Sequence, residues 1–193
     1  MRLIQTLTLT PILLLSTLLI AACDRTAPAA ASTAMVPARP VHRTEWILPV
    51  TTAAAQPDLV RAPDGALLLS WVEVQGDGHA LKFARYADGA WGEVQQIARG
   101  DDWFVNWADT PHLAVTADGA LWAHWLQKSA QAKYAYDVAM VRSGDGGVTW
   151  STPVLVNDDG TPTEHGFVSM WPAARDRIGI AWLDGRRTGG GEA

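Results

Sequence analysis

Cysteine is nearly absent from this sequence of 193 residues, since Cys23 is the only one. A chain with one thiol forms no internal disulfide, so its fold depends on packing and hydrogen bonds even in an oxidising compartment. An excess of positive charge is also absent, because 15 basic residues face 20 acidic ones and the formal net charge is −5. Nucleic-acid-binding domains carry clustered Lys and Arg, so we expect no nucleic-acid partner.

A long uninterrupted apolar run is missing as well. A membrane-spanning helix needs about 20 largely apolar residues, and Gln, Thr, Ser and Pro residues interrupt the segment from Leu3 to Ile20. This segment follows the charged residue Arg2 and ends in the small residues Ala21 and Ala22. A charged start, an apolar stretch and small residues at the cleavage point predict a secretory signal peptide over residues 1–22.

The end of this segment, Ile20-Ala21-Ala22-Cys23, resembles the lipobox of bacterial lipoproteins. The resemblance implies cleavage before Cys23 and a diacylglycerol on its thiol. Each buried CH₂ contributes about 0.8 kcal/mol, so two or three acyl chains anchor a protein firmly to a membrane. We therefore expect a lipid-anchored protein of the cell envelope that faces the periplasm, with the choice between inner and outer membrane open.

The remaining chain divides by composition. Residues 23–44 are rich in Ala and Pro, which predicts a flexible tether with extended segments. Residues 45–193 are enough for one folded domain. Long helical periodicity is missing from this domain, and short apolar runs separated by turn residues predict an all-β fold.

An internal repeat organises the domain. Residues 57–71 align without gaps with residues 111–125, and both segments run from Pro to Trp. Each contains Asp-Gly, a strong hairpin signal because glycine accepts positive φ without steric cost. A third, shorter copy begins at Trp171-Pro172. Repeat units that begin at residues 57, 111 and 172 and contain about four short strands each predict the blades of a β-propeller.

The sequence from Ser143 to Trp150, Ser-Gly-Asp-Gly-Gly-Val-Thr-Trp, resembles the Asp-box of the bacterial neuraminidase repeat. The resemblance is to the sialidase-like superfamily of six-bladed propellers, and it covers about residues 45–193. A short carboxylate accepts backbone N–H groups in tight turns, so the Asp-box predicts a structural role. The residues expected to carry it are Ser143, Asp145, Gly147 and Trp150.

The resemblance also implies how many blades the complete propeller contains. At about 55 residues per blade, six blades need roughly 330 residues. We therefore expect about two and a half blades here, the N-terminal part of a longer protein. Assembly of several chains into a closed ring is the alternative.

Two positions depart from the sialidases of this superfamily. These enzymes hold the substrate carboxylate with three arginines, the first in an Arg-Ile-Pro motif. Ala55-Gln56-Pro57 stands at the corresponding place, so alanine replaces the arginine. Glu73-Val74-Gln75 likewise stands where Glu-x-Arg is frequent. Both departures argue against hydrolysis of sialic acid.

Two loops rich in acids and aromatic residues, 101–111 and 157–169, precede the second and third repeats. Loops at this position meet at the mouth of a propeller, and paired carboxylates there suit glycoside hydrolysis. The candidate catalytic residues are Glu164 and Asp109, with His165 as a proton carrier. The candidate substrate-binding residues are Trp103, Asn106, Asp184 and Arg186.

Blander interpretations stay open. For the two loops it is a solvated loop with buried structural tryptophans, and for residues 182–187 it is an Asp-Gly turn beside a solvated arginine pair. The segment from Asn157 to Gly160 offers oxygen ligands for calcium, but its spacing matches no EF-hand loop. We predict no metal and no cofactor.

Three functions follow as hypotheses. The first is a lipid-anchored, sialidase-like propeller that binds or hydrolyses glycans. The second is a non-enzymatic scaffold or assembly protein of the periplasm. The third is an inactive truncated fragment.

Overall fold

The structure is a computed structural model in which residues 42–188 are described. The chain separates into two units, residues 1–44 and 45–193, and the fold below is that of the second unit. The predicted signal peptide, Cys23, which is predicted to carry the lipid, and most of the predicted tether lie outside the described residues. No helix in the described part is long and apolar enough to span a membrane.

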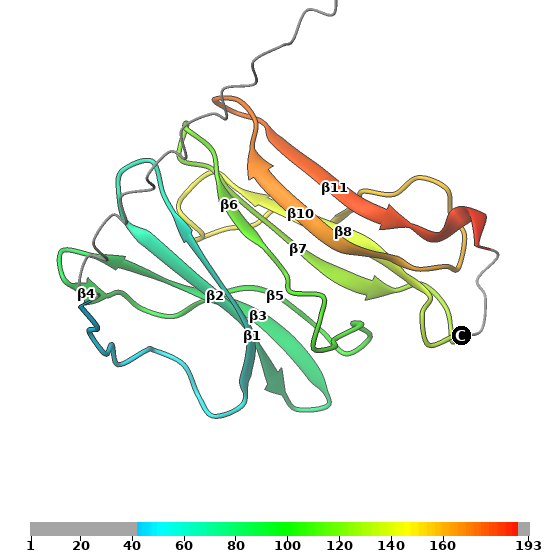
Figure 1. The fold of residues 1–193 in the computed structure, drawn as a ribbon, viewed down its shortest axis with the longest axis horizontal. Coiled ribbons are helices and arrows are strands. Elements are labelled where there is room, and N and C mark those ends of the chain that lie inside the picture. The colour runs from blue at the N-terminus through cyan, green and yellow to red at the C-terminus, as the bar shows by residue number, and fades with distance from the viewer. Residues whose placement is uncertain (1–41, 189–193) are drawn as a thin grey trace, which may run out of the picture. The chain divides into compact units, whose positions relative to one another are not determined.

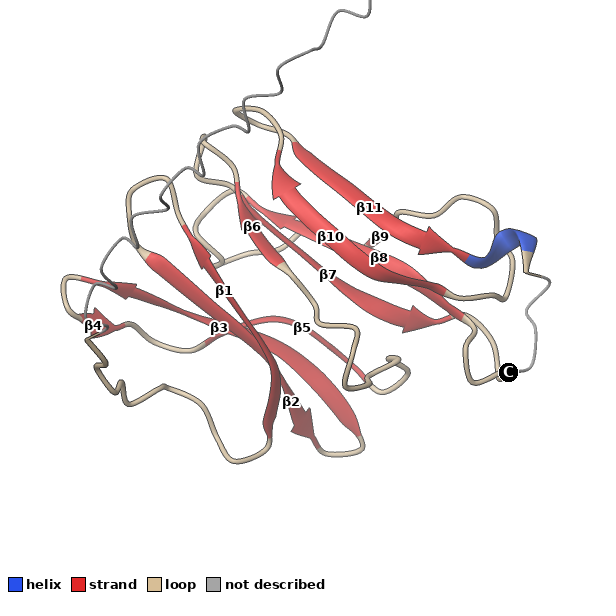
Figure 2. Cartoon of the chain, viewed as in Figure 1, coloured by secondary structure: helices blue, strands red, loops and turns tan. Residues whose placement is uncertain are grey.

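The described residues form three antiparallel sheets and one short 3₁₀ helix, which confirms the predicted all-β class (Figures 1 and 2). The first sheet contains β1 (Ala54–Arg61), β2 (Leu67–Gln75), β3 (Gly78–Ala87), β4 (Ala90–Trp91) and β5 (Gln95–Gly100). The second contains β6 (Leu113–Val115), β7 (Leu121–Lys128), β8 (Tyr136–Ser143) and β9 (Val154–Leu155). The third contains β10 (His165–Pro172) and β11 (Ile178–Asp184), followed by the 3₁₀ helix η1 (Gly185–Arg187).

The strands of each sheet follow one another in sequence order, except that β4 and β5 both pair with β3. The first strands of the sheets, β1, β6 and β10, lie next to one another, because β6 contacts both β1 and β10. Asp58 on β1 makes this contact specific, since its Oδ2 accepts a hydrogen bond from the Leu113 backbone N–H at 3.1 Å.

The strand register corrects the third repeat. Residue pairs Arg61–Leu67, Val115–Leu121 and Pro172–Ile178 close the three hairpins, so each turn has the same length. Val168, and not Trp171-Pro172, therefore stands at the position of Pro57, and the third copy is as long as the other two. The third turn, residues 173–177, lacks the Asp-Gly pair that anchors the alignment of the first two.

The core lies between the sheets. Leu68, Phe83 and Leu81 of the first sheet pack with Leu121 and Trp125 of the second in one cluster of buried apolar side chains. Residues 68–72 of β2 are all buried, because this strand has neighbours on both faces. Such a strand is a continuous apolar run and not an alternating one.

The turn after β8 is held by its own side chains. Asp145 Oδ1 accepts hydrogen bonds from the Ser143 hydroxyl at 2.7 Å and the Thr149 N–H at 2.9 Å, and Oδ2 accepts from the Thr149 hydroxyl at 2.5 Å. The bonds from Thr149 and Ser143 lower the pKa of Asp145 to about 2. Trp150 donates its Nε1–H to the Gly147 carbonyl at 3.1 Å. Both oxygens of the Asp145 carboxylate therefore accept hydrogen bonds within the turn, which fits the structural role predicted for this residue.

Candidate functional site

The first strands β1 and β10 both begin with a strained bulge. The register shifts between Ala55 and Asp58 in β1 and between Gly166 and Ser169 in β10. Inside these bulges Gln56 has φ 51° and Phe167 has φ 50°. A bulky residue at positive φ is a steric outlier that the surrounding structure must hold in place.

Asp109 of the 101–111 loop holds both bulges. Its Oδ1 accepts the Phe167 backbone N–H at 2.6 Å, and its carbonyl oxygen accepts from Gln56 Nε2 at 2.8 Å. Asn106 fixes the carboxylate in turn, because its Nδ2 donates to Asp109 Oδ2 at 2.6 Å. Asp109 is only 7% exposed.

Glu164 and Asp109 both lie near Tyr136. The Tyr136 hydroxyl donates to Glu164 Oε1 at 2.7 Å. A Cβ atom on Gly166 would lie 2.9 Å from Asp109 Oδ1 and 3.1 Å from the Tyr136 hydroxyl, so both groups border this glycine. The structure thus brings Asp109 and Glu164, hereafter the acid pair, to the same end of the first strands.

Tyr136 is a hydrogen-bond donor in this arrangement. Burial raises its pKa well above the usual range, and the bond to Glu164 and the nearby charge of Asp109 act in the same direction. Phe104 stacks on the ring, with centroids 4.0 Å apart and planes 11° from parallel. A phenol that stays protonated at neutral pH is a poor nucleophile, and it positions Glu164 instead.

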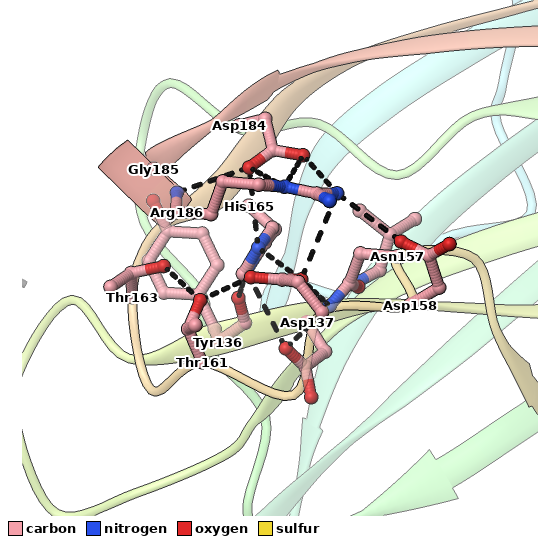
Figure 3. Close-up of polar contacts among 12 residues, drawn as sticks. Tyr136, Asp137, Asn157, Asp158, Thr161, Thr163, His165, Asp184, Gly185 and Arg186 are labelled. Carbon is pink, nitrogen blue, oxygen red and sulfur yellow. Dashed lines mark hydrogen bonds and ion pairs between the residues drawn. The ribbon is translucent and has the colours of Figure 1, made fainter. Parts of the chain in front are cut away.

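His165 belongs to a different set of contacts, shown in Figure 3. Successive residues of a strand point to opposite faces, and His165 is fully buried with partners other than the acid pair. Its Nδ1 lies 3.0 Å from the Tyr136 carbonyl oxygen, and its Nε2 lies 3.1 Å from Asp159 Oδ1. These contacts do not support His165 as the proton carrier for Glu164.

The surroundings of His165 are dominated by carboxylates, and we call Asp137, Asp159, His165, Asp184 and Arg186 the His165 cluster. Asp184 lies opposite His165 in the β10–β11 register. Arg186 Nη2 donates to Asp184 Oδ2 at 2.6 Å, and its Nε donates to Oδ1 at 2.8 Å. Arg186 therefore holds the pKa of Asp184 well below its usual range. The predicted substrate-binding arginine has its planar fork engaged by this carboxylate (Figure 3).

The cluster arises where the third repeat departs from the first two. Trp71 Nε1 donates to Glu73 Oε2, and Trp125 Nε1 donates to Gln127 Oε1, both at 3.2 Å. The equivalent Trp182 Nε1 is buried without a partner among the described residues. Its counterpart acid, Asp184, is one methylene shorter and turns to Arg186 and His165. The third repeat thus gives up a hydrogen bond that the others make, at a cost of about 1–3 kcal/mol for a buried unpaired donor.

Three ligand atoms of the cluster lie close enough to share an ion. Asp159, His165 and Asp184 each offer one nitrogen or oxygen, and these atoms lie within 4.8 Å of one another. The sequence prediction of no metal did not foresee this arrangement, because the hairpin between His165 and Asp184 creates it.

The other predicted binding residues have structural contacts. Trp103 is 8% exposed and stacks on Trp125, with centroids 5.1 Å apart, so its face is not available to a sugar. Asn106 Oδ1 accepts the N–H groups of Ala108 and Asp109, both at 2.7 Å, and so shapes its loop. Phe167, whose backbone N–H binds Asp109, is 51% exposed.

Sequence reasoning missed Tyr136 and Phe167, and it considered Asp159 only as part of a possible calcium segment, without His165 or Asp184. Tyr136 is 28 residues from Glu164, and no local motif links them. A signal for the His165 cluster was present in the second residue after each repeat tryptophan, which is Glu73, Gln127 and Asp184 in the three repeats. The shortened acid in the third copy marks the place where the repeat changes its contacts.

Comparison with known proteins gives the following. No protein-family model matches the sequence, and no curated protein matches it. Among solved structures, the chain is similar to the endo-arabinase from Bacteroides thetaiotaomicron VPI-5482, with a TM-score of 0.47 and 18% identity over 67% of this chain and 50% of that one. It is also similar to the α-L-arabinanase of Penicillium chrysogenum complexed with arabinobiose, with a TM-score of 0.38 and 20% identity over 53% of this chain and 31% of that one. The chain thus spans half the length of the first of these proteins and about a third of the second.

Proposed function

We propose that this chain is part of a lipid-anchored β-propeller of the cell envelope, related to the sialidase-like superfamily, that binds glycans and hydrolyses glycosidic bonds. The observation that supports this proposal is the acid pair. Asp109 and Glu164 lie near Tyr136 at the strained start of β10, where the backbone N–H of the half-exposed Phe167 binds Asp109. A pair of carboxylates is what most glycoside hydrolases use for catalysis.

The two acids differ in their surroundings, which divides the roles between them. Both oxygens of Asp109 accept hydrogen bonds from N–H groups, so this carboxylate is fixed in place. Glu164 is half-buried, and among the described residues only its Oε1 accepts a hydrogen bond, from Tyr136. Glu164 is therefore the group that transfers a proton to the leaving oxygen, and Asp109 stabilises positive charge that develops on the sugar ring.

A neutral glycan fits this site better than sialic acid. The acid pair would repel a substrate carboxylate. Arg186, the arginine predicted to face the substrate, is engaged by Asp184. Ala55 also stands where a sialidase carries its first arginine. The proposed substrate class is accordingly an uncharged polysaccharide or oligosaccharide.

The test is hydrolysis by the full chain on a panel of neutral and sialylated glycans, with arabinan among them. Glu164→Gln keeps the size of the side chain and removes its proton chemistry, so we expect turnover to fall at least about 100-fold. The matched control is Glu93→Gln, an exposed acid in the loop between β4 and β5, which should keep wild-type turnover. Circular dichroism should show that both variants remain folded.

Two results would contradict the proposed glycosidase activity. One is equal turnover by the wild type and Glu164→Gln. The other is a wild type that cleaves no glycan of the panel.

The burial of Asp109 favours a second candidate function, a non-enzymatic scaffold in the periplasm. Both oxygens of this carboxylate serve the protein's own loops, and the residue is nearly inaccessible. A scaffold predicts that Asp109→Asn destabilises the fold and that no variant or wild type cleaves glycans.

A further inference from the structure

The ring of His165 is oriented by the backbone. Its Nδ1 lies 3.0 Å from the Tyr136 carbonyl oxygen. A carbonyl oxygen only accepts, so Nδ1 carries the proton and Nε2 of the neutral ring presents a lone pair. Because the imidazole is fully buried, water does not reach this nitrogen.

The lone pair faces negative oxygens. Nε2 lies 3.1 Å from Asp159 Oδ1 and 3.8 Å from Asp184 Oδ1. The shorter contact lacks the alignment of a hydrogen bond, and Nε2 has no hydrogen-bond partner among the described residues. A proton on Nε2 would therefore not bond well to Asp159. A cation that all three atoms share would remove the repulsion.

The charge balance of the cluster favours such a cation. Asp137, Asp159 and Asp184 all lie within 4 Å of His165 or Arg186. Arg186 is the one cation among these side chains when His165 is neutral. The carboxylates thus outnumber the guanidinium, and a dication would compensate the excess.

Each of the three ligand residues is also held by a second partner. Thr161 Oγ1 donates to Asp159 Oδ2, Arg186 donates to Asp184, and the Tyr136 carbonyl orients His165 (Figure 3). Side chains that bind metals are usually oriented in this way by a second hydrogen-bonded group.

We propose that Asp159, His165 and Asp184 form a binding site for a divalent transition metal, with zinc as the first choice. One imidazole nitrogen and two carboxylate oxygens suit zinc, whereas calcium prefers oxygen ligands alone. Ligand atoms around a tetrahedral zinc ion lie about 3–3.5 Å apart, given bonds of about 2.1 Å. The ion joins the β10–β11 hairpin to the loop that contains Asp159, and its binding does not depend on glycan hydrolysis.

The test is titration of the chelator-treated full chain with zinc chloride, followed by isothermal calorimetry. We expect one zinc per chain and a rise of the unfolding temperature with zinc. Asp159→Asn and Asp184→Asn should each weaken zinc at least about tenfold. The matched control is Asp158→Asn, an exposed neighbour whose carboxylate faces Arg186 and not His165, and its affinity should stay within about twofold of wild type.

A second measurement covers variants that fail to fold. Zinc added to the wild type should shift the imidazole NMR signals of His165 and leave those of His79 unchanged. The proposal is wrong if the wild type binds no zinc up to millimolar concentration. It is equally wrong if zinc binds with the same affinity to wild type, Asp159→Asn and Asp184→Asn.

Discussion

Burial of His124 contributes to the acid sensitivity of the domain. His124 on β7 is buried, and its Nε2 accepts a hydrogen bond from the backbone N–H of His112 at 3.0 Å. Burial lowers the pKa of His124 from 6.5 to about 3, and the charge of His112 adds to this effect. The native protein therefore keeps His124 neutral at a pH where the unfolded chain protonates it.

We predict that the free energy of unfolding falls as the pH is lowered from 6.5 to 5, by on the order of 1 kcal/mol per pH unit. The sign follows because the unfolded state binds the extra proton below pH 6.5. His124→Gln should remove this slope, which urea unfolding at a series of pH values would measure.

His112 provides the internal contrast to His124. Its bond to Asp58 raises the pKa of His112. Its stabilising contribution is therefore complete below pH 6.5 and is lost as the pH rises through the raised value. It does not produce the acid slope, so an unchanged slope in His124→Gln would contradict the assignment to His124.

At the scale of elements, the bulge at the start of β10 joins structure to the proposed function. Phe167 adopts φ 50°, and the residue is half-exposed. A left-handed conformation costs about 1–2 kcal/mol for a residue with a side chain, and glycine avoids this cost. The strain is maintained by the bond from the Phe167 N–H to Asp109.

We predict that Phe167→Gly is more stable than Phe167→Ala by about 1 kcal/mol, because only glycine relieves the strain. Both variants lose the aromatic face, so both should bind and cleave glycan more weakly than wild type to the same degree. Denaturant unfolding and turnover assays measure the two effects. If Phe167→Ala were the more stable variant, the strain would not lie in the backbone of this bulge.

The elements differ in how well sequence predicts them. Asp64-Gly65 and Asp118-Gly119 predict hairpins, and both glycines have positive φ, 91° and 87°. The third hairpin lacks this pair, so the sequence alone places the start of the third repeat at Trp171-Pro172 and not at Val168. The bulges at Gln56 and Phe167 have no sequence signal, because neither residue type favours positive φ and a distant carboxylate, Asp109, holds them.

At the scale of the whole described domain, three repeats placed side by side bring distant residues to one end of their first strands. The 101–111 loop reaches β1 and β10 through Asp109, and Tyr136 reaches Glu164 from β8. The sequence identified both acids of the pair from their loops. It did not identify Tyr136 or the His165 cluster, because these contacts depend on how neighbouring sheets pack.

The central claim is that this end of the first strands, and not the hairpin end, is the functional end. Hydrogen–deuterium exchange of the full chain tests it directly, with and without a saturating neutral glycan from the panel. We predict slower exchange in residues 104–110 and 163–168 and no change in the hairpin turns 62–66 and 116–120. Protection confined to those turns, or no protection with any glycan, would contradict the account.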